Sequence, residues 1–143
     1  MRMTTWIDIS ETALPAEQVH EFLYASQGGG VCVFVGTTRR VTLEEVTEHL
    51  WYEAHNTMAL KEMEKIVKRA SQQWSLLRVV MLHRTGKVSV GEASVIVGAA
   101  TAHRGPAFEA TRFLIDELKK SVQIWKKDVS PDGSSFWVDS GLG

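Results

Sequence analysis

The side chains best suited to chemistry lie at the two ends of one stretch, residues 101–127. One end carries His103 and Arg104, and the other carries two lysine pairs, Lys119-Lys120 and Lys126-Lys127. Lysine and arginine side chains bind phosphate and carboxylate groups through charge-assisted hydrogen bonds. The stretch is therefore predicted to handle an anion.

His103 and Arg104 follow a predicted buried strand and precede a helix that is expected to begin near Pro106. The free amides and the dipole at a helix start favour a bound anion, so a phosphate or carboxylate is the expected guest. The alternative is a capping histidine beside a surface arginine.

The lysine pairs allow two interpretations. Lys119 and Lys120 fall in the last helical turn, where the helix dipole favours cations, so structure alone can explain them. Lys126 and Lys127 are expected on the following strand, pointing to opposite faces, and one of them shares a face with Ile124. A lysine held among apolar and cationic neighbours has a lowered pKa, which suits a general acid, a base or a nucleophile.

A second candidate group follows the apolar run 31–35, where Gly36-Thr37-Thr38 leads into Arg39 and Arg40. Loops after buried strands often carry binding residues, and two arginines there could clamp an anion. A solvated loop is the alternative.

The spacing of these groups limits how one chain can use them. Lys119 follows His103 by 16 residues, which is roughly 20–24 Å along a helix. A small substrate cannot touch both ends. Either the ends are unrelated, or a symmetric dimer brings the His-Arg end of one copy beside the lysine end of the other.

The elements that position these residues follow from hydrophobic periodicity and turn signals. Gly28-Gly29-Gly30 is expected to end the first helix and let the backbone turn, and Gly98 is expected to let another segment approach closely. Alternation predicts strands at 5–9 and 46–54. Apolar runs and turn signals predict strands at 31–35, 77–82, 87–90, 93–101, 123–129 and 135–138. Helical spacing predicts helices from Pro15 to about Ser26, from an Asn56 cap to Trp74 and from near Pro106 to Lys120. The order predicts an α+β fold with mainly antiparallel sheet and about three helices.

Composition narrows the function classes. A length of 143 residues predicts a single domain, 1–143, and a net charge of −1 argues against bulk nucleic-acid binding. The lone Cys32 is expected to be buried, and it excludes an internal disulfide and a multi-cysteine metal site. No metal or cofactor is expected. Without a membrane span or signal peptide in the sequence, a cytoplasmic location is expected.

Several motifs together resemble the large, catalytic subunit of molybdopterin synthase, over about residues 31–138. They are G-T-T-R-R, W-Y-E-A-H-N-T-M, H-R-T-G-K-V-S-V-G-E-A-S-V, A-H-R-G-P-A-F-E-A and L-K-K-S-V-Q-I-W-K-K-D, in this order. The resemblance implies an α/β hammerhead-like core and a homodimer within a heterotetramer. Each end would bind a small ubiquitin-like sulfur carrier, whose C-terminal Gly-Gly thiocarboxylate gives sulfur to cyclic pyranopterin monophosphate. Two transfers would make the molybdopterin dithiolene.

The resemblance also implies roles for single residues. Lys119 and Lys126 match the catalytic lysines, and Arg39, His103 and Arg104 match residues that hold the substrate, chiefly its phosphate. Further candidates are Arg40, Lys120 and Lys127. Arg40-Val41 departs from the family pattern, as does the short tail after Val138. A non-catalytic phosphate- or pterin-binding paralogue is the alternative function, and a pure interaction scaffold is a third.

Overall fold

The computed structural model describes residues 3–42 and 45–138. Its helices are α1 (Ala16–Tyr24), α2 (Asn56–Gln73) and α3 (Arg104–Ser121). Its strands are β1 (Thr4–Ser10), β2 (Gly30–Thr37), β3 (Val41–Thr42), β4 (Glu45–Val46), β5 (His49–Ala54), β6 (Arg78–Arg84), β7 (Gly86–Ser89), β8 (Ala93–Thr101), β9 (Ile124–Val129) and β10 (Ser135–Val138).

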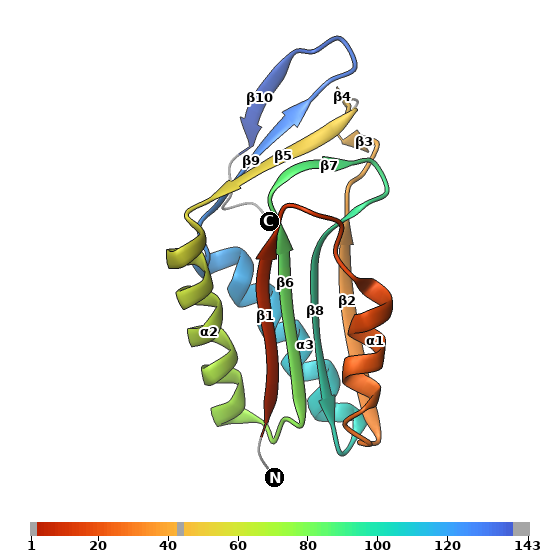
Figure 1. The fold of residues 1–143 in the computed structure, drawn as a ribbon, viewed down its shortest axis with the longest axis vertical. Helices are drawn as coiled ribbons and strands as arrows, with labels where there is room; N and C mark the ends of the chain where they lie inside the picture. The colour runs from red at the N-terminus through yellow and green to blue at the C-terminus, as the bar shows by residue number, and fades with distance from the viewer. Residues whose placement is uncertain (1–2, 43–44, 139–143) are drawn as a thin grey trace.

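The larger body of the molecule is a four-stranded sheet in the order β1-β6-β8-β2. β1 runs parallel to β6, while the β6–β8 and β8–β2 pairs are antiparallel. A second sheet, β10-β9-β5-β7, is antiparallel throughout and extends from one end of the first (Figure 1). The predicted α+β class with mainly antiparallel sheet is confirmed.

Helices cover the first sheet on both faces, and the alternation of side chains along β6 explains why. Val79 and Met81 point into the core formed with α2 and α3, whereas Val80 and Leu82 point into a smaller core that includes Val19 and Leu23 of α1. Both sets are buried, which is why β6 reads as a continuous apolar run rather than an alternating one.

Helix α3 carries the predicted apolar stripe, and the stripe fixes where its two ends lie. Its buried members pack against β8, β2 and α2. They are Ala107, Ala110, Leu114 and Leu118. The helix begins at Arg104, two residues before the expected start near Pro106, so Arg104 belongs to its first turn.

The strand predicted at 46–54 is interrupted. Thr47 leaves the ladder because its hydroxyl donates to both carboxylate oxygens of buried Asp128, at 3.0 Å each, and its amide donates to the Arg40 carbonyl at 2.7 Å. The result is the short β3–β4 pair followed by β5. The predicted helix cap also moves by one residue, since His55, not Asn56, accepts from the Met58 amide at 3.3 Å.

The three glycines after α1 do not make the turn. The residue with positive φ is Gln27, at 59°, while the glycines let this segment pack against residues 101–104. A Cβ on Gly30 would lie 2.9 Å from the His103 carbonyl carbon and oxygen. Cys32 is also less enclosed than predicted, because edge strand β2 leaves it half-buried.

The hairpin predicted around Pro131-Asp132-Gly133 is confirmed. Gly133 adopts a φ of +89°, and Asp132 accepts from the amide and hydroxyl of Ser134. β9 and β10 pair on either side. The predicted frayed tail, 139–143, lies outside the described residues.

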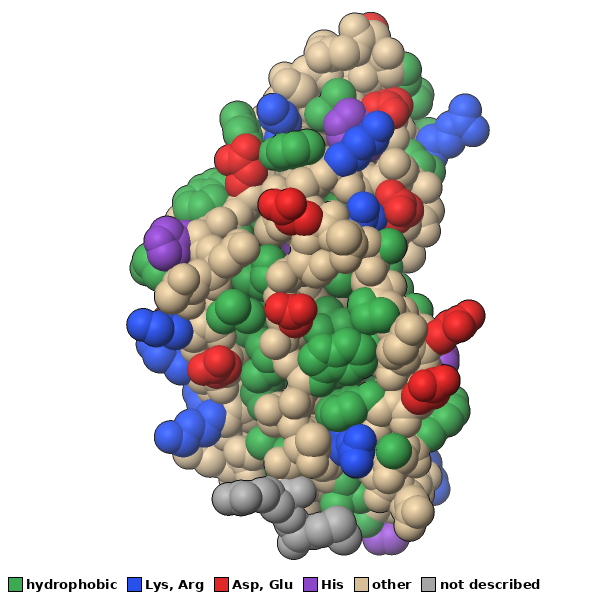
Figure 2. All heavy atoms as spheres, in the orientation of Figure 1, with side chains coloured by type: hydrophobic (Ala, Val, Ile, Leu, Met, Phe, Trp, Pro, Cys, Tyr) green, Lys and Arg blue, Asp and Glu red, His purple; other side chains and the backbone are tan. Residues whose placement is uncertain are grey.

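Acidic and basic side chains are interspersed over the face seen in Figure 2, with apolar side chains at its centre. This distribution fits a net charge of −1 and means that any basic site is local. Within residues 3–42 and 45–138, no helix is long and apolar enough to cross a membrane.

Replacing Gly98 tests the packing of β8. A Cβ there would lie 2.8 Å from the Cys32 carbonyl oxygen and 3.0 Å from Leu23 Cδ1, so Gly98→Ala should lower the free energy of unfolding by about 1–3 kcal/mol. Gly105→Ala is the matched control, because no atom lies within 4 Å of its added Cβ. Urea unfolding of both variants checks this, and an unchanged Gly98→Ala midpoint would contradict it.

Candidate active site

Lys119 and Lys126 are brought together where α3 ends and β9 begins. Buried Leu118 and Val122 hold the end of α3 against the core, and buried Ile124 starts β9. Of the two strand lysines, Lys126 is the one that shares the face of Ile124, and it lies opposite Tyr52 of β5. The two lysine charges are close enough to act on each other.

Both ammonium groups are partly removed from water. Desolvation lowers the pKa of Lys119, and the charge of Lys126 lowers it further. Desolvation also lowers the pKa of Lys126, followed by the charge of Arg39, while Asp128 opposes the shift. Lys119 as a whole residue is exposed. Its pKa is therefore lowered by the local surroundings of the ammonium group and not by burial of the whole side chain.

The lysine pair lacks a carboxylate partner among the described residues. No ion pair within 4.0 Å involves Lys119, Lys126 or Arg39 in this part of the chain. The carboxylate whose charge acts on Lys126, that of Asp128, accepts a hydrogen bond from Thr47. A partly dry group of like charges without a counter-ion is suited to receive an anionic ligand.

The neighbouring lysines are engaged elsewhere. Lys120 pairs with Glu117 at 3.6 Å on the surface of α3. Lys127 points to the other face of its sheet, where its ammonium lies 5.2 Å from the centre of the Trp137 ring. Arg40 is exposed and offers its backbone carbonyl to Thr47.

The sequence did not predict His83 and Tyr52 as site residues, although both belong to the surroundings of the lysine pair. The His83 ring, 4% exposed, packs edge-on to Tyr52 with centroids 5.0 Å apart. Burial lowers the pKa of His83 to about 4, and the charges of Lys119 and Lys126 act in the same direction. Its position at the end of an apolar strand was the available signal, but its neighbours across the fold could not be read from the sequence.

His103 and Arg104 lie at the opposite end of α3 (Figure 1). His103 takes the cap position without a side-chain cap bond, so the capping interpretation is not supported, and both side chains are exposed. The close packing of Gly30 and a hydrogen bond from Thr101 to the His103 carbonyl fix the backbone there. Within one chain, the structure does not bring these residues to the lysines.

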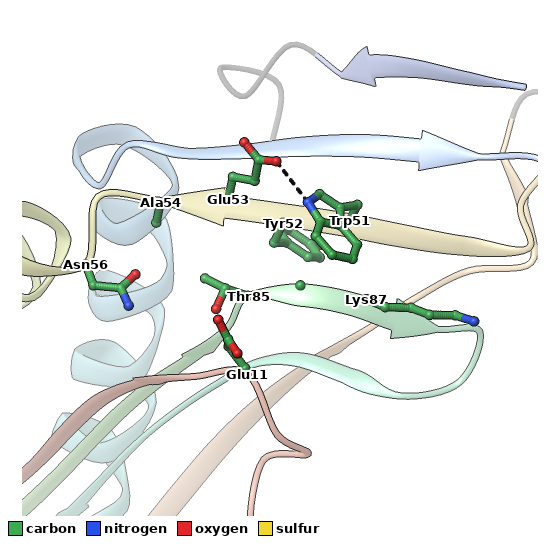
Figure 3. A pocket seen from close by; sticks show the side chains of 9 residues that line it. Glu11, Trp51, Tyr52, Glu53, Ala54, Asn56, Thr85 and Lys87 are labelled. Carbon is green, nitrogen blue, oxygen red and sulfur yellow. Dashed lines mark hydrogen bonds between the residues drawn. The ribbon is translucent and has the colours of Figure 1, made fainter.

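A cleft of about 550 Å³ opens beside β5 and β7 (Figure 3). Its wall includes Trp51 and Glu53, and the Trp51 indole nitrogen donates to the Glu53 carboxylate at 3.0 Å. The other lining residues are Glu11, Tyr52, Ala54, Asn56, Thr85, Gly86 and Lys87. None of the predicted site residues lines it, although Tyr52, which lies opposite Lys126, forms part of its wall. Among the described residues, no group of three or more His, Cys, Asp or Glu side chains could hold a metal.

The chain is similar to known proteins over most of its length. The family model described as MoaE protein matches residues 9–121. The molybdopterin synthase catalytic subunit of Pyrococcus abyssi is 37% identical over 123 residues, covering 86% of this chain and 82% of that protein. The structure of molybdopterin synthase from Staphylococcus aureus matches with a TM-score of 0.85 and 32% identity, over 92% of this chain and 95% of that chain.

A more distant structure supports the fold alone. It is described as a complex of subunits 1 and 2 of molybdopterin-converting factor from Helicobacter pylori, with a TM-score of 0.74 and 21% identity. The match covers 96% of this chain and 90% of that chain.

The lowered pKa of His83 predicts a pH-dependent loss of stability. The folded chain keeps this histidine neutral down to about pH 4, whereas the unfolded chain protonates it near pH 6.5. The contribution is therefore complete above pH 6.5 and is lost as the pH falls towards 4. Between pH 7 and 5 the free energy of unfolding should fall by about 2 kcal/mol more in the native protein than in His83→Gln. Urea unfolding at both pH values measures this difference, and equal losses in the two proteins would contradict the prediction.

Proposed function

The chain belongs to the MoaE protein family, the family of molybdopterin synthase catalytic subunits, and we propose that it is a sulfurtransferase. In this proposal it transfers sulfur from the thiocarboxylated C-terminus of a small carrier subunit to cyclic pyranopterin monophosphate. Two transfers make the dithiolene of molybdopterin.

The observation that carries the proposal is the lysine pair. Lys119 and Lys126 are partly desolvated, act on each other and have no carboxylate partner within 4.0 Å among the described residues. Like charges held together in this way are unfavourable for the free protein, so the arrangement is explained by an anion that occupies it.

The chemistry requires such a site. The nucleophilic sulfur belongs to the carrier, so half-buried Cys32 need not act. Attack on the substrate and opening of its cyclic phosphate develop negative charge, which fixed ammonium groups stabilise. When the carrier loses its sulfur it leaves as a carboxylate, with the oxygen supplied by water. A lowered lysine pKa also makes proton transfer to and from these groups easier near neutral pH.

We assign the holding of the substrate phosphate to Arg39, His103 and Arg104. Of these three residues, Arg39 acts through its charge on Lys126 of the same chain. His103 and Arg104 lie at the far end of α3, so they would serve the lysines of a second copy. The working unit is then a dimer of this chain with one carrier at each end, a heterotetramer.

The first test compares two adjacent lysines. Lys119→Ala should lower dithiolene formation by about 10²-fold or more, because it removes a charge from the reacting site. Lys120→Ala is the matched control and should keep activity within about 3-fold, since Lys120 pairs with Glu117 on the surface. The assay supplies purified thiocarboxylated carrier and substrate, and circular dichroism verifies folding.

Full activity of folded Lys119→Ala would exclude its catalytic role. If the native protein binds the pterin but does not turn over with a competent carrier, the chain is instead a binding module. The altered Arg40-Val41 loop is the sequence feature that would favour that alternative.

Mixed dimers test whether the site is shared between two copies. His103→Ala and Lys119→Ala should each be inactive alone, yet a mixed dimer has one site in which both residues are native. Mixing should therefore restore up to about half of the native activity per mixed dimer. If mixed dimers form, as shown by differently tagged chains, and no activity returns, the shared site is wrong.

A further inference from the structure

The first sheet does not orient Arg39 by itself. β2 shifts its register against β8 between Gly36 and Thr37, and its pairing ends at Thr37. An irregularity of this kind turns the chain that follows it, and it is common beside active sites. The residues from Thr38 onward therefore take their direction from other contacts.

The backbone just before Arg39 is held by the connection between β7 and β8. Thr38 is buried, and its amide donates to the Glu92 carbonyl at 3.1 Å. The Thr38 carbonyl accepts in return from the Gly91 amide at 3.0 Å. The Arg39 side chain is exposed, so these two hydrogen bonds, rather than packing of its own, set where it leaves the fold.

The backbone just after Arg39 is tied to the strand that carries Lys126. The Arg40 carbonyl accepts from the Thr47 amide, and the Thr47 hydroxyl donates to the Asp128 carboxylate. Asp128 lies two residues from Lys126 on β9, so the two side chains share a face of their sheet. These contacts link the backbone around Arg39 to the face on which Lys126 lies.

The connection that holds Thr38 is a β-turn, residues 89–92, and Glu92 closes it twice. The Glu92 amide donates to the Ser89 carbonyl at 3.0 Å, and Gly91 at the third position has a φ of +85°. The Glu92 side chain adds a second closure, because its Oε1 accepts from the Ser89 amide at 2.8 Å. The shape of the turn therefore depends on one carboxylate.

The other oxygen of that carboxylate meets Arg84 at the end of β6. Arg84 Nη1 lies 3.2 Å from Glu92 Oε2, and the Arg84 side chain is 12% exposed. Its Nε and Nη1 are buried and make no hydrogen bond among the described residues, so Glu92 supplies the counter-charge of a largely buried guanidinium. A buried charge without a partner is costly, so the pair holds the turn against the first sheet.

We infer, on the premise of the proposed function, that Glu92 is a positioning residue for Arg39. Its carboxylate joins Arg84 to the Ser89 amide and so keeps the turn in the shape that bonds both backbone groups of Thr38. Arg39 is thereby held where its guanidinium can meet the substrate phosphate. Glu92 acts only through Arg39 and does not touch the pterin.

A double-mutant cycle tests whether Glu92 acts through Arg39. Glu92→Ala should raise KM for the pterin by about 10-fold or more, because a misplaced arginine binds the phosphate less well, with kcat changed less than about 3-fold. Arg39→Ala should raise KM at least as much. The double variant should match Arg39→Ala within about 2-fold, because no arginine is left to position.

A Glu92 that only stabilised the fold would give effects on KM that multiply in the double variant, and that result would overturn the inference. Native KM in Glu92→Ala would overturn it too. Circular dichroism verifies folding, and Glu92→Gln takes the place of Glu92→Ala in the cycle if the alanine variant does not fold.

Hydrogen exchange tests the structural part without substrate. The amides of Thr38 and Gly91 both donate between the turn and residue 38, so they should exchange slowly in the native protein. Glu92→Gln keeps the size of the side chain but removes the charge that pairs with Arg84, and should speed exchange at both amides by about 10-fold or more. Val90→Ala, in the same turn and 39% exposed, is the matched control and should change both by less than about 3-fold. Rapid exchange at Thr38 in the native protein, or no change in Glu92→Gln, would overturn the inference.

The two failures are distinguishable. If Arg39→Ala leaves KM unchanged, the proposed role of Arg39 in holding the substrate fails, and Glu92 has no reaction to serve. If Arg39→Ala raises KM but the effects multiply in the double variant, the proposed function stands and the positioning role of Glu92 is wrong.

Discussion

The proposed site depends on holding two like charges, those of Lys119 and Lys126, together at the edge of the core. Desolvation and the charge of Lys126 lower the pKa of Lys119, and Arg39 adds a further positive charge beside Lys126. Repulsion would move these side chains apart if the backbone that carries them were free. The apolar stripe of α3 prevents this, because its four buried residues anchor the helix to the sheet. Burying one such leucine stabilises the fold by about 1.5–3 kcal/mol, which opposes the repulsion between the two ammonium groups. The core can therefore sustain the unfavourable cluster.

The length of α3 is the second constraint. Its stripe runs from Ala107 to Leu118, so the helix cannot bend its ends together without exposing apolar surface. One end presents Lys119 beside β9, and the other presents His103 and Arg104 beside the glycines of residues 28–30. A straight helix cannot bring its two ends to one small substrate, so the proposed site takes one end from each of two copies.

Much of this could be predicted from the sequence because local patterns decide it. Alternation, apolar runs and helical spacing found the principal elements, and alternation required that one of Lys126 and Lys127 share the face of Ile124. Local patterns failed where distant residues decide. Asp128, 81 residues away, breaks the strand at Thr47. The glycines after α1 pack against residues 101–104 and do not make the turn. His83 was missed as a site residue for the same reason, since its neighbours come from β5, β9 and α3.

The two lysine pairs show how surroundings separate identical side chains. Successive residues on a helix differ by about 100° in direction, and successive residues on a strand point to opposite faces. Only one lysine of each pair can therefore face the junction of α3 and β9. Lys120 and Lys127 turn towards Glu117 and Trp137, where their charges are satisfied on the surface. Among the described residues, Lys119 and Lys126 have no such partners, and the buried, neutral His83 ring, on which both charges act, adds no third charge. The proposed site therefore depends on the absence of a carboxylate beside Lys119 and Lys126 among the described residues as much as on the lysines themselves.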